Sequence, residues 1–143
     1  MYLIEQSACE LLAQSQIFAL ATIVRNEGAT PRTAGSKMIV TRAGRGIGTI
    51  GDGSLEAAVM ARAVHLVKKE QSEVMHFDLG GDAITAGDMI CGGSADVLPA
   101  CVLPTPANRD IFSRWQQVLG QNRTDDIIVV TGQRAEDLKA ALA

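Results

Sequence analysis

The stretch IFALATIV, Ile17 to Val24, is a near-continuous apolar run that decides how the rest of the chain is arranged. Such a run is typical of a strand buried on both faces of a sheet. Before it, residues 2–14 place apolar side chains at helical spacing, which predicts a one-sided helix. After it, residues 26–32 break regular structure. Two short stretches, 37–41 and 46–50, then flank the turn sequence RAGR and predict a hairpin.

Further along the chain, helical and strand-like patterns alternate. A helix is expected from about Leu55 to Glu70, and a strand from Glu73 to Leu79. After a loop over 80–87, a second strand spans 94–103, where Pro99 should push it to an edge or break it. The remaining patterns predict a helix at 108–119, a strand at 126–131 and a helix at 135–142. This order predicts a single α/β (α+β) domain with a mixed or largely antiparallel sheet flanked by helices.

Composition and charge narrow the classes of partner. The chain has 143 residues and a net charge of −3, which gives no reason to expect binding to nucleic acid or to an anionic membrane. No apolar run has the length of a membrane span, and the N-terminus lacks the pattern of a secretory signal. The cysteines Cys9, Cys91 and Cys101 are too few and too scattered for a disulfide framework. We therefore expect a cytoplasmic protein with reduced thiols.

Three glycine-rich segments carry the functional information: GATPRTAGSKM (28–38), GTIGDGSLE (48–56) and DMICGG (88–93). Glycine allows backbone N–H groups to approach a ligand that a side chain would block. In the first segment, Arg32 could bind phosphate with parallel N–H donors, with Lys37 beside it. The alternative is a surface loop with solvated charges. We expect the three segments to gather at one edge of the sheet.

The second segment ends at a predicted helix start, where free N–H groups from Gly51 to Ser54 form a candidate anion site. The alternative is ordinary helix capping by Asp52 or Ser54, and the carboxylate of Asp52 would repel an anion. Glu56 could act as a general base, although stabilisation by the helix dipole explains it as well. Residues 46–51 match the dinucleotide fingerprint G-x-G-x-x-G literally, but a turn precedes them, so we reject that match.

Cys91 has the most distinctive setting of the three cysteines. It follows a loop and precedes Gly92 and Gly93, so backbone amides can surround its sulfur and favour the thiolate. A thiolate would suit a thiophilic metal or a sulfur-bearing ligand. A buried, inert cysteine in a glycine turn explains the pattern equally well. His65 and His76 have no partner at metal-ligand spacing in the sequence.

The patterns G-x-x-P-R-x-x-G-x-x-M (28–38), G-T-I-G-x-G-x-L-E (48–56) and C-G-G (91–93), in this order, resemble the XdhC/CoxI family. These are accessory proteins for the maturation of xanthine dehydrogenase, carbon monoxide dehydrogenase and related molybdenum hydroxylases. The motif-bearing part covers about residues 15–103, and 107–143 would form an extra helix, strand and helix. The family usually has Gly at the position of Asp52 and commonly Cys or His at that of Ser54. Its full-length members also carry a C-terminal Rossmann-type domain, whose fingerprint we do not find in this sequence.

The resemblance implies a chaperone, without turnover of its own, that binds the molybdenum cofactor (molybdopterin or its dinucleotide) transiently and inserts it into a target apoenzyme. The implied partners are that molybdenum hydroxylase apoenzyme, a sulfur-donating desulfurase, a separate Rossmann-domain chain and a second copy in a homodimer. Cys91 would contact molybdenum or its sulfur. The other implied cofactor-binding residues are Gly92, Gly93, Arg32, Lys37, Gly51, Gly53, Ser54 and Glu56. The alternatives are a small cysteine-dependent sulfur-transfer protein and a regulatory or structural subunit with a degenerate site.

Overall fold

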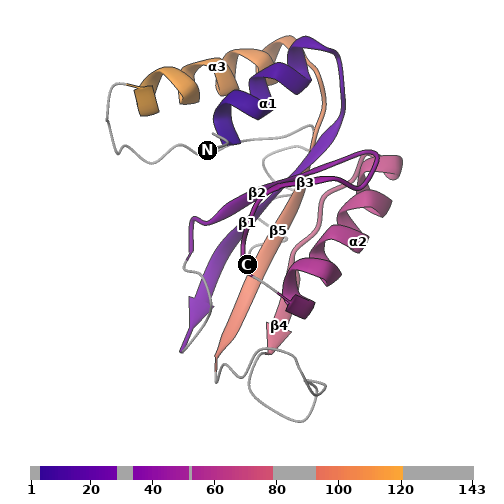
Figure 1. Cartoon of the computed structure of the whole chain (residues 1–143), viewed down its shortest axis with the longest axis vertical. Coiled ribbons are helices and arrows are strands. Elements are labelled where there is room, and N and C mark those ends of the chain that lie inside the picture. The colour runs from indigo at the N-terminus through magenta and orange to yellow at the C-terminus, as the bar shows by residue number, and fades with distance from the viewer. Residues whose placement is uncertain (1–3, 29–33, 52, 79–92, 121–143) are drawn as a thin grey trace.

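The computed structural model describes residues 4–28, 34–51, 53–78 and 93–120. The described elements are α1 (Ile4–Ala13), β1 (Phe18–Glu27), β2 (Lys37–Thr41), β3 (Gly46–Gly48), α2 (Gly53–Lys69), β4 (Met75–Asp78), β5 (Ser94–Val102) and α3 (Pro106–Gly120). The strands form one sheet in the order β3-β2-β1-β5-β4, and every neighbouring pair is antiparallel. The predicted α+β class with a largely antiparallel sheet is confirmed (Figure 1).

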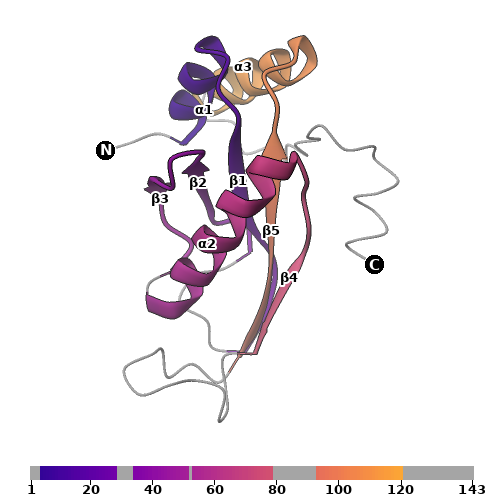
Figure 2. The same ribbon diagram turned by 90° about the vertical axis from the view of Figure 1, so that its right-hand side faces the viewer.

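The apolar run that begins at Ile17 forms most of the central strand, β1, and is covered on both faces as predicted. Ala19, Ala21 and Ile23 pack in a cluster with α2 on one face. Phe18 and Leu20 pack in a second cluster with α1 and α3 on the other. Figure 2 shows α1 and α3 together over one end of the sheet, whereas α2 runs along the opposite face. The part of this face of the sheet that α1 and α3 do not cover carries polar side chains, which are described below.

Aromatic contacts fix α3 on this face. Phe112 is fully buried, and its ring lies edge-on to Phe18, with the ring centroids 6.0 Å apart. Trp115 packs against Phe112 in a similar way, at 5.7 Å. The helix begins at Pro106, two residues before the predicted start, because Thr105 caps it: its Oγ1 accepts the N–H of Asn108 at 3.1 Å.

Pro99 does not push β5 to the edge of the sheet, contrary to the prediction, since β5 lies between β1 and β4. Pro99 pairs with Ala21 of β1. Two residues further on, Cys101 donates its N–H to Ser72 Oγ at 2.8 Å, on the side away from β1. The nitrogen of Pro99 has the same orientation, and the pairing of β4 with β5 ends at Val97. The N–H that proline lacks would therefore point to the β4 side, beyond the last residue pair of β4 and β5. No hydrogen bond between the strands is lost there.

Other boundaries differ from the predictions by a few residues. β3 ends at Gly48 rather than at residue 50, and α2 begins at Gly53 rather than at Leu55. β4 covers 75–78 of the predicted 73–79, and α1 covers 4–13 of the predicted 2–14. The predicted loop at 80–87, strand at 126–131 and helix at 135–142 lie outside the described residues. None of the helices in the described part of the chain is long and apolar enough to cross a membrane.

Candidate functional site

The strand order directs the described flanks of all three glycine segments toward the same end of the sheet, which agrees in part with the expectation that the segments gather at one edge. With every pair antiparallel, β1, β3 and β4 end where β2 and β5 begin. The first segment connects β1 to β2, the second leads from β3 into α2, and the third precedes β5. In Figure 2 β1 and β4 end, and β5 begins, at the bottom of the sheet, whereas Gly48 at the end of β3 is level with Ala21 of β1.

Some of the predicted site residues lie outside the described residues, namely Arg32, Cys91 and Gly92, and so does Asp52. The described ones are Lys37, Gly51, Gly53, Ser54, Glu56 and Gly93. No group of three or more His, Cys, Asp or Glu side chains that could hold a metal ion occurs among the described residues. The predicted molybdenum contact of Cys91 therefore stays a prediction.

Lys37 is the first residue of β2 and lies opposite Thr22 of β1. Its Nζ donates a hydrogen bond to the carbonyl oxygen of Gly35 at 2.9 Å, and burial lowers the pKa of its ammonium group. By strand alternation it shares a face with Ile39, which packs with α1 and α3. Ser54 instead belongs to α2, on the opposite face. The structure therefore does not place Lys37 and the α2 N-terminus on the same face.

The turn before α2 uses part of its own hydrogen-bonding capacity. Gly51 donates its N–H to Thr49 Oγ1 at 3.1 Å, and that hydroxyl in turn donates to the carbonyl oxygen of Gly51. This N–H is therefore already satisfied, contrary to its predicted role as a ligand donor. Gly53 begins the helix with φ of 66°, and both it and Ser54 are exposed. The remaining candidate donors at this turn are the N–H groups of Gly53 and Ser54.

Glu56, in the first turn of α2, has an unusual environment. Its Oε1 is buried and has no hydrogen-bond partner among the described residues. A buried acceptor without a donor is costly, unless a ligand or a proton supplies one. Glu56 lies in the first turn of α2, where an acidic side chain interacts favourably with the helix dipole. Glu56 therefore offers an acceptor for an N–H or O–H group, and it would repel a phosphate.

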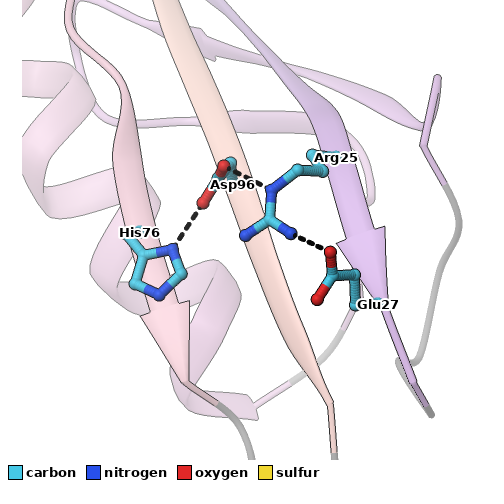
Figure 3. Close-up of polar contacts among 4 residues, drawn as sticks. All are labelled: Arg25, Glu27, His76 and Asp96. Atoms are coloured by element: carbon cyan, nitrogen blue, oxygen red, sulfur yellow. Dashed lines mark hydrogen bonds and ion pairs between the residues drawn. The ribbon is translucent and has the colours of Figure 1, made fainter. Parts of the chain in front are cut away.

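A polar cluster that the sequence analysis did not find lies across three strands (Figure 3). Asp96 of β5 pairs with Arg25 of β1 on one side and with His76 of β4 on the other. One carboxylate oxygen accepts from Arg25 Nε at 2.8 Å, and the other lies 2.6 Å from His76 Nδ1. Arg25 also forms an ion pair with Glu27 at 2.7 Å. The hydrogen bond from Arg25 and then that from His76 hold the pKa of the Asp96 carboxyl below its usual value.

Next to this cluster is an open cavity of about 400 Å³. It is lined by Glu27, Gly28, His76, Asp78, Gly93 and Ser94. Gly28 and Gly93 belong to two different glycine segments, so the cavity lies where the flanks of these segments meet. Of the predicted site residues, only Gly93 lies in this lining as the structure describes it. The sequence alone gave His76 and Asp78 no role in a site, because only strand register brings His76 beside Asp96; the alternation of both with the half-buried Met75 and Phe77 was the available signal.

Residues 11–78 match the model of the XdhC and CoxI family. This segment belongs to the XdhC and CoxI family. Uncharacterized protein YqeB from Escherichia coli (strain K12) is 31% identical over 90 residues, which make up 63% of this chain and 16% of YqeB. The sequence patterns at 28–38 and 48–56 fall inside the family match, and the C-G-G pattern lies beyond it.

A solved structure shares the fold. The crystal structure of a xanthine dehydrogenase from Bacillus halodurans superposes with a TM-score of 0.67 and 24% sequence identity. The match covers 82% of this chain and 36% of that chain. The chain therefore shares its fold with part of a larger protein. It spans well under half the length of either relative.

Proposed function

We propose that this chain binds the molybdenum cofactor and delivers it to the apoenzyme of a molybdenum hydroxylase of the xanthine dehydrogenase or carbon monoxide dehydrogenase type. The observation that carries the proposal is that the described flanks of the three glycine segments are directed toward one end of the sheet, in a chain whose residues 11–78 belong to the XdhC and CoxI family. In this proposal the protein is a cytoplasmic chaperone without turnover of its own. Its further partners are a sulfur-donating desulfurase, a Rossmann-domain chain and a second copy of itself.

The described residues fit parts of such a ligand. Glu56 supplies a buried acceptor without a partner, and Gly93 lines a cavity at the same end of the sheet. In the proposal, Cys91 contacts the metal or its sulfur, and Gly92 beside it permits close approach. The phosphate binds Arg32 and Lys37, while the N–H groups of Gly53 and Ser54, on the opposite face of the sheet, bind another polar part of the cofactor. When bound, the cofactor would supply a pterin, a phosphate or nucleotide, and a metal with oxygen and sulfur ligands.

The test is an anaerobic titration of the chain with purified molybdenum cofactor, comparing the native protein with Cys91→Ala. We expect stoichiometric binding that weakens about tenfold or more in the variant, which corresponds to about 1.4 kcal/mol. Cys9→Ala is the matched control, because Cys9 lies on α1, at the other end of the sheet. Absence of binding by the native chain, or equal loss in both variants, would contradict the proposal.

One observation favours the alternative of cysteine-dependent sulfur transfer. In the sequence, no histidine was placed to activate the thiol of Cys91. In the structure, His76 and Gly93 line the same cavity, and Gly93 follows Cys91 by two residues in the sequence. A sulfur-transfer protein would turn over with a low-molecular-weight sulfur donor and lose that activity in Cys91→Ala. No turnover at saturating donor would remove this alternative.

A further inference from the structure

The cavity beside the polar cluster is rich in hydrogen-bond acceptors. Its described lining contains carboxylates of Glu27 and Asp78, the imidazole of His76 and the hydroxyl of Ser94, but no lysine or arginine. The nearby guanidinium of Arg25 is directed at Asp96 and Glu27, at 2.8 and 2.7 Å. An anion beside this described lining would therefore meet mainly hydrogen-bond acceptors.

Asp96 determines which ring nitrogen of His76 carries the proton. The carboxyl of Asp96, ionised at neutral pH, can only accept a hydrogen bond, so the neutral imidazole must carry its hydrogen on Nδ1. Nε2 then presents a lone pair. Figure 3 shows the second ring nitrogen pointing away from Asp96. The His76 side chain is 62% exposed, so this acceptor is open to a ligand.

The size and rim of the cavity suit a flat ring. Its volume of about 400 Å³ falls within the range of small-molecule sites, roughly 300–1,000 Å³. Gly28, which has φ of 70°, and Gly93 line it without side chains. A planar ligand can therefore approach the backbone at these two positions.

We propose that this cavity binds a neutral planar heterocycle with adjacent N–H donors, the 2-amino-4-oxopyrimidine edge shared by pterins and guanine, and that it excludes phosphate. The ring would donate to His76 Nε2 and to the carboxylates of Asp78 and Glu27. The assignment to a pterin rests on the proposed function, since the pterin is the part of that cofactor with this chemistry. The phosphate must then bind elsewhere.

The test is a fluorescence titration of the native chain with 6-hydroxymethylpterin, which carries the edge without a phosphate. Lumazine, in which an oxo group replaces the 2-amino group, should bind at least tenfold more weakly. Inorganic phosphate should not displace the pterin. Competition with guanosine distinguishes the two sources of the edge, and preference for either one supports the proposal.

Two variants test the role of the histidine. His76→Phe keeps a ring but removes the acceptor, and it should weaken pterin binding about tenfold. Asp96→Asn can donate to Nδ1 and so shift the proton to Nε2, with a similar loss. His65→Phe is the matched control, because His65 is exposed on α2 and should not affect binding. The ¹⁵N chemical shifts of His76 report its tautomer directly, and the native protein should show Nδ1–H.

Equal binding of pterin and lumazine, displacement by phosphate, absence of pterin binding or an Nε2–H tautomer in native His76 would each overturn the proposal. The outcome is separable from that of the proposed function. If the whole cofactor binds but the free pterin does not, the function stands and this cavity is not its pterin site. If the pterin binds but the cofactor does not, the cavity assignment stands and the chaperone function fails.

Discussion

Replacing Gly48 with alanine should destabilise the fold and leave ligand binding by the folded protein unchanged. Gly48 has φ of 82°, a conformation that costs an L-residue roughly 1–2 kcal/mol. A Cβ at this position would overlap Ile4 Cδ1 and lie 3.2 Å from the carbonyl oxygen of Lys37. Overpacking typically adds about 1–3 kcal/mol. Because Ile4 Cδ1 is the end of a flexible side chain, the lower part of that range applies.

Alanine also reduces the freedom of the unfolded chain, which returns about 0.4–1 kcal/mol. The expected net loss for Gly48→Ala is therefore about 2 kcal/mol, a large part of the roughly 5–15 kcal/mol of a typical domain. Gly35→Ala is the matched control. Gly35 also has a positive φ, 96°, but nothing lies within 4 Å of its would-be Cβ, so it should lose only about 1 kcal/mol or less.

Urea unfolding, followed by the fluorescence of Trp115, measures both losses. Trp115 is the chain's one tryptophan and is only 8% exposed in the fold, so unfolding should change its emission. Adding Ile4→Val, which removes Cδ1, should recover part of the loss in Gly48→Ala but not in Gly35→Ala. The packing explanation is refuted if the two alanine variants lose the same stability. It is also refuted if Gly48→Ala keeps its stability but loses cofactor binding, which would make Gly48 a ligand residue.

Three other predictions concern the polar cluster, the packing of α3 and the cysteines. Because the pKa of Asp96 is lowered in the fold, its contribution to stability should be fully present above its ordinary value of 3.8 and be lost as the pH falls through the folded-state pKa. Urea unfolding of the native protein and Asp96→Asn between pH 2.5 and about 7 tests this, and a pH-independent difference would contradict it. Phe112→Ala should cost about 3–5 kcal/mol in the same assay, since the ring is fully buried; a loss below about 1 kcal/mol would show that α3 is not held by it. Burial raises the pKa of the Cys101 thiol to about 11, and burial, then the charges of Glu5 and Glu10, raise the pKa of the Cys9 thiol. Iodoacetamide at about pH 8 should therefore label Cys91 first. Equal labelling of the three cysteines, measured by peptide mass spectrometry, would contradict this.

The sequence predicted the architecture well where one local pattern determined the result. The apolar run at 17–24 had to be covered on both faces, and the structure makes it the central strand. The hairpin around RAGR and the helix that ends near Glu70 also depend on short-range signals, namely turn residues and helical spacing. Pro99 was misplaced because its tolerance depends on where the neighbouring strand ends, which no local pattern shows.

The candidate site was harder to predict because its parts are joined by strand register. Asp96 faces Arg25 only because β1 shifts register between Ile23 and Arg25. Without that shift, strand alternation would turn Arg25 toward the opposite face. His76 and Asp96 are 20 residues apart and meet only through the pairing of β4 with β5. A single sequence gives residue types and spacing along each strand, but not this register.

The glycine segments also turn out to contain residues with different roles. Gly46 and Gly48 belong to β3, where an added Cβ would contact Met38 and Met60 or Ile4, so their lack of a side chain is a packing requirement. Gly28 and Gly93 instead line an open cavity. A glycine pattern such as G-T-I-G is therefore evidence for the fold first and for a ligand only at those positions that border open space. The family resemblance and the candidate site thus rest on partly different residues, which is why substitutions at Gly48 and at His76 should separate stability from binding.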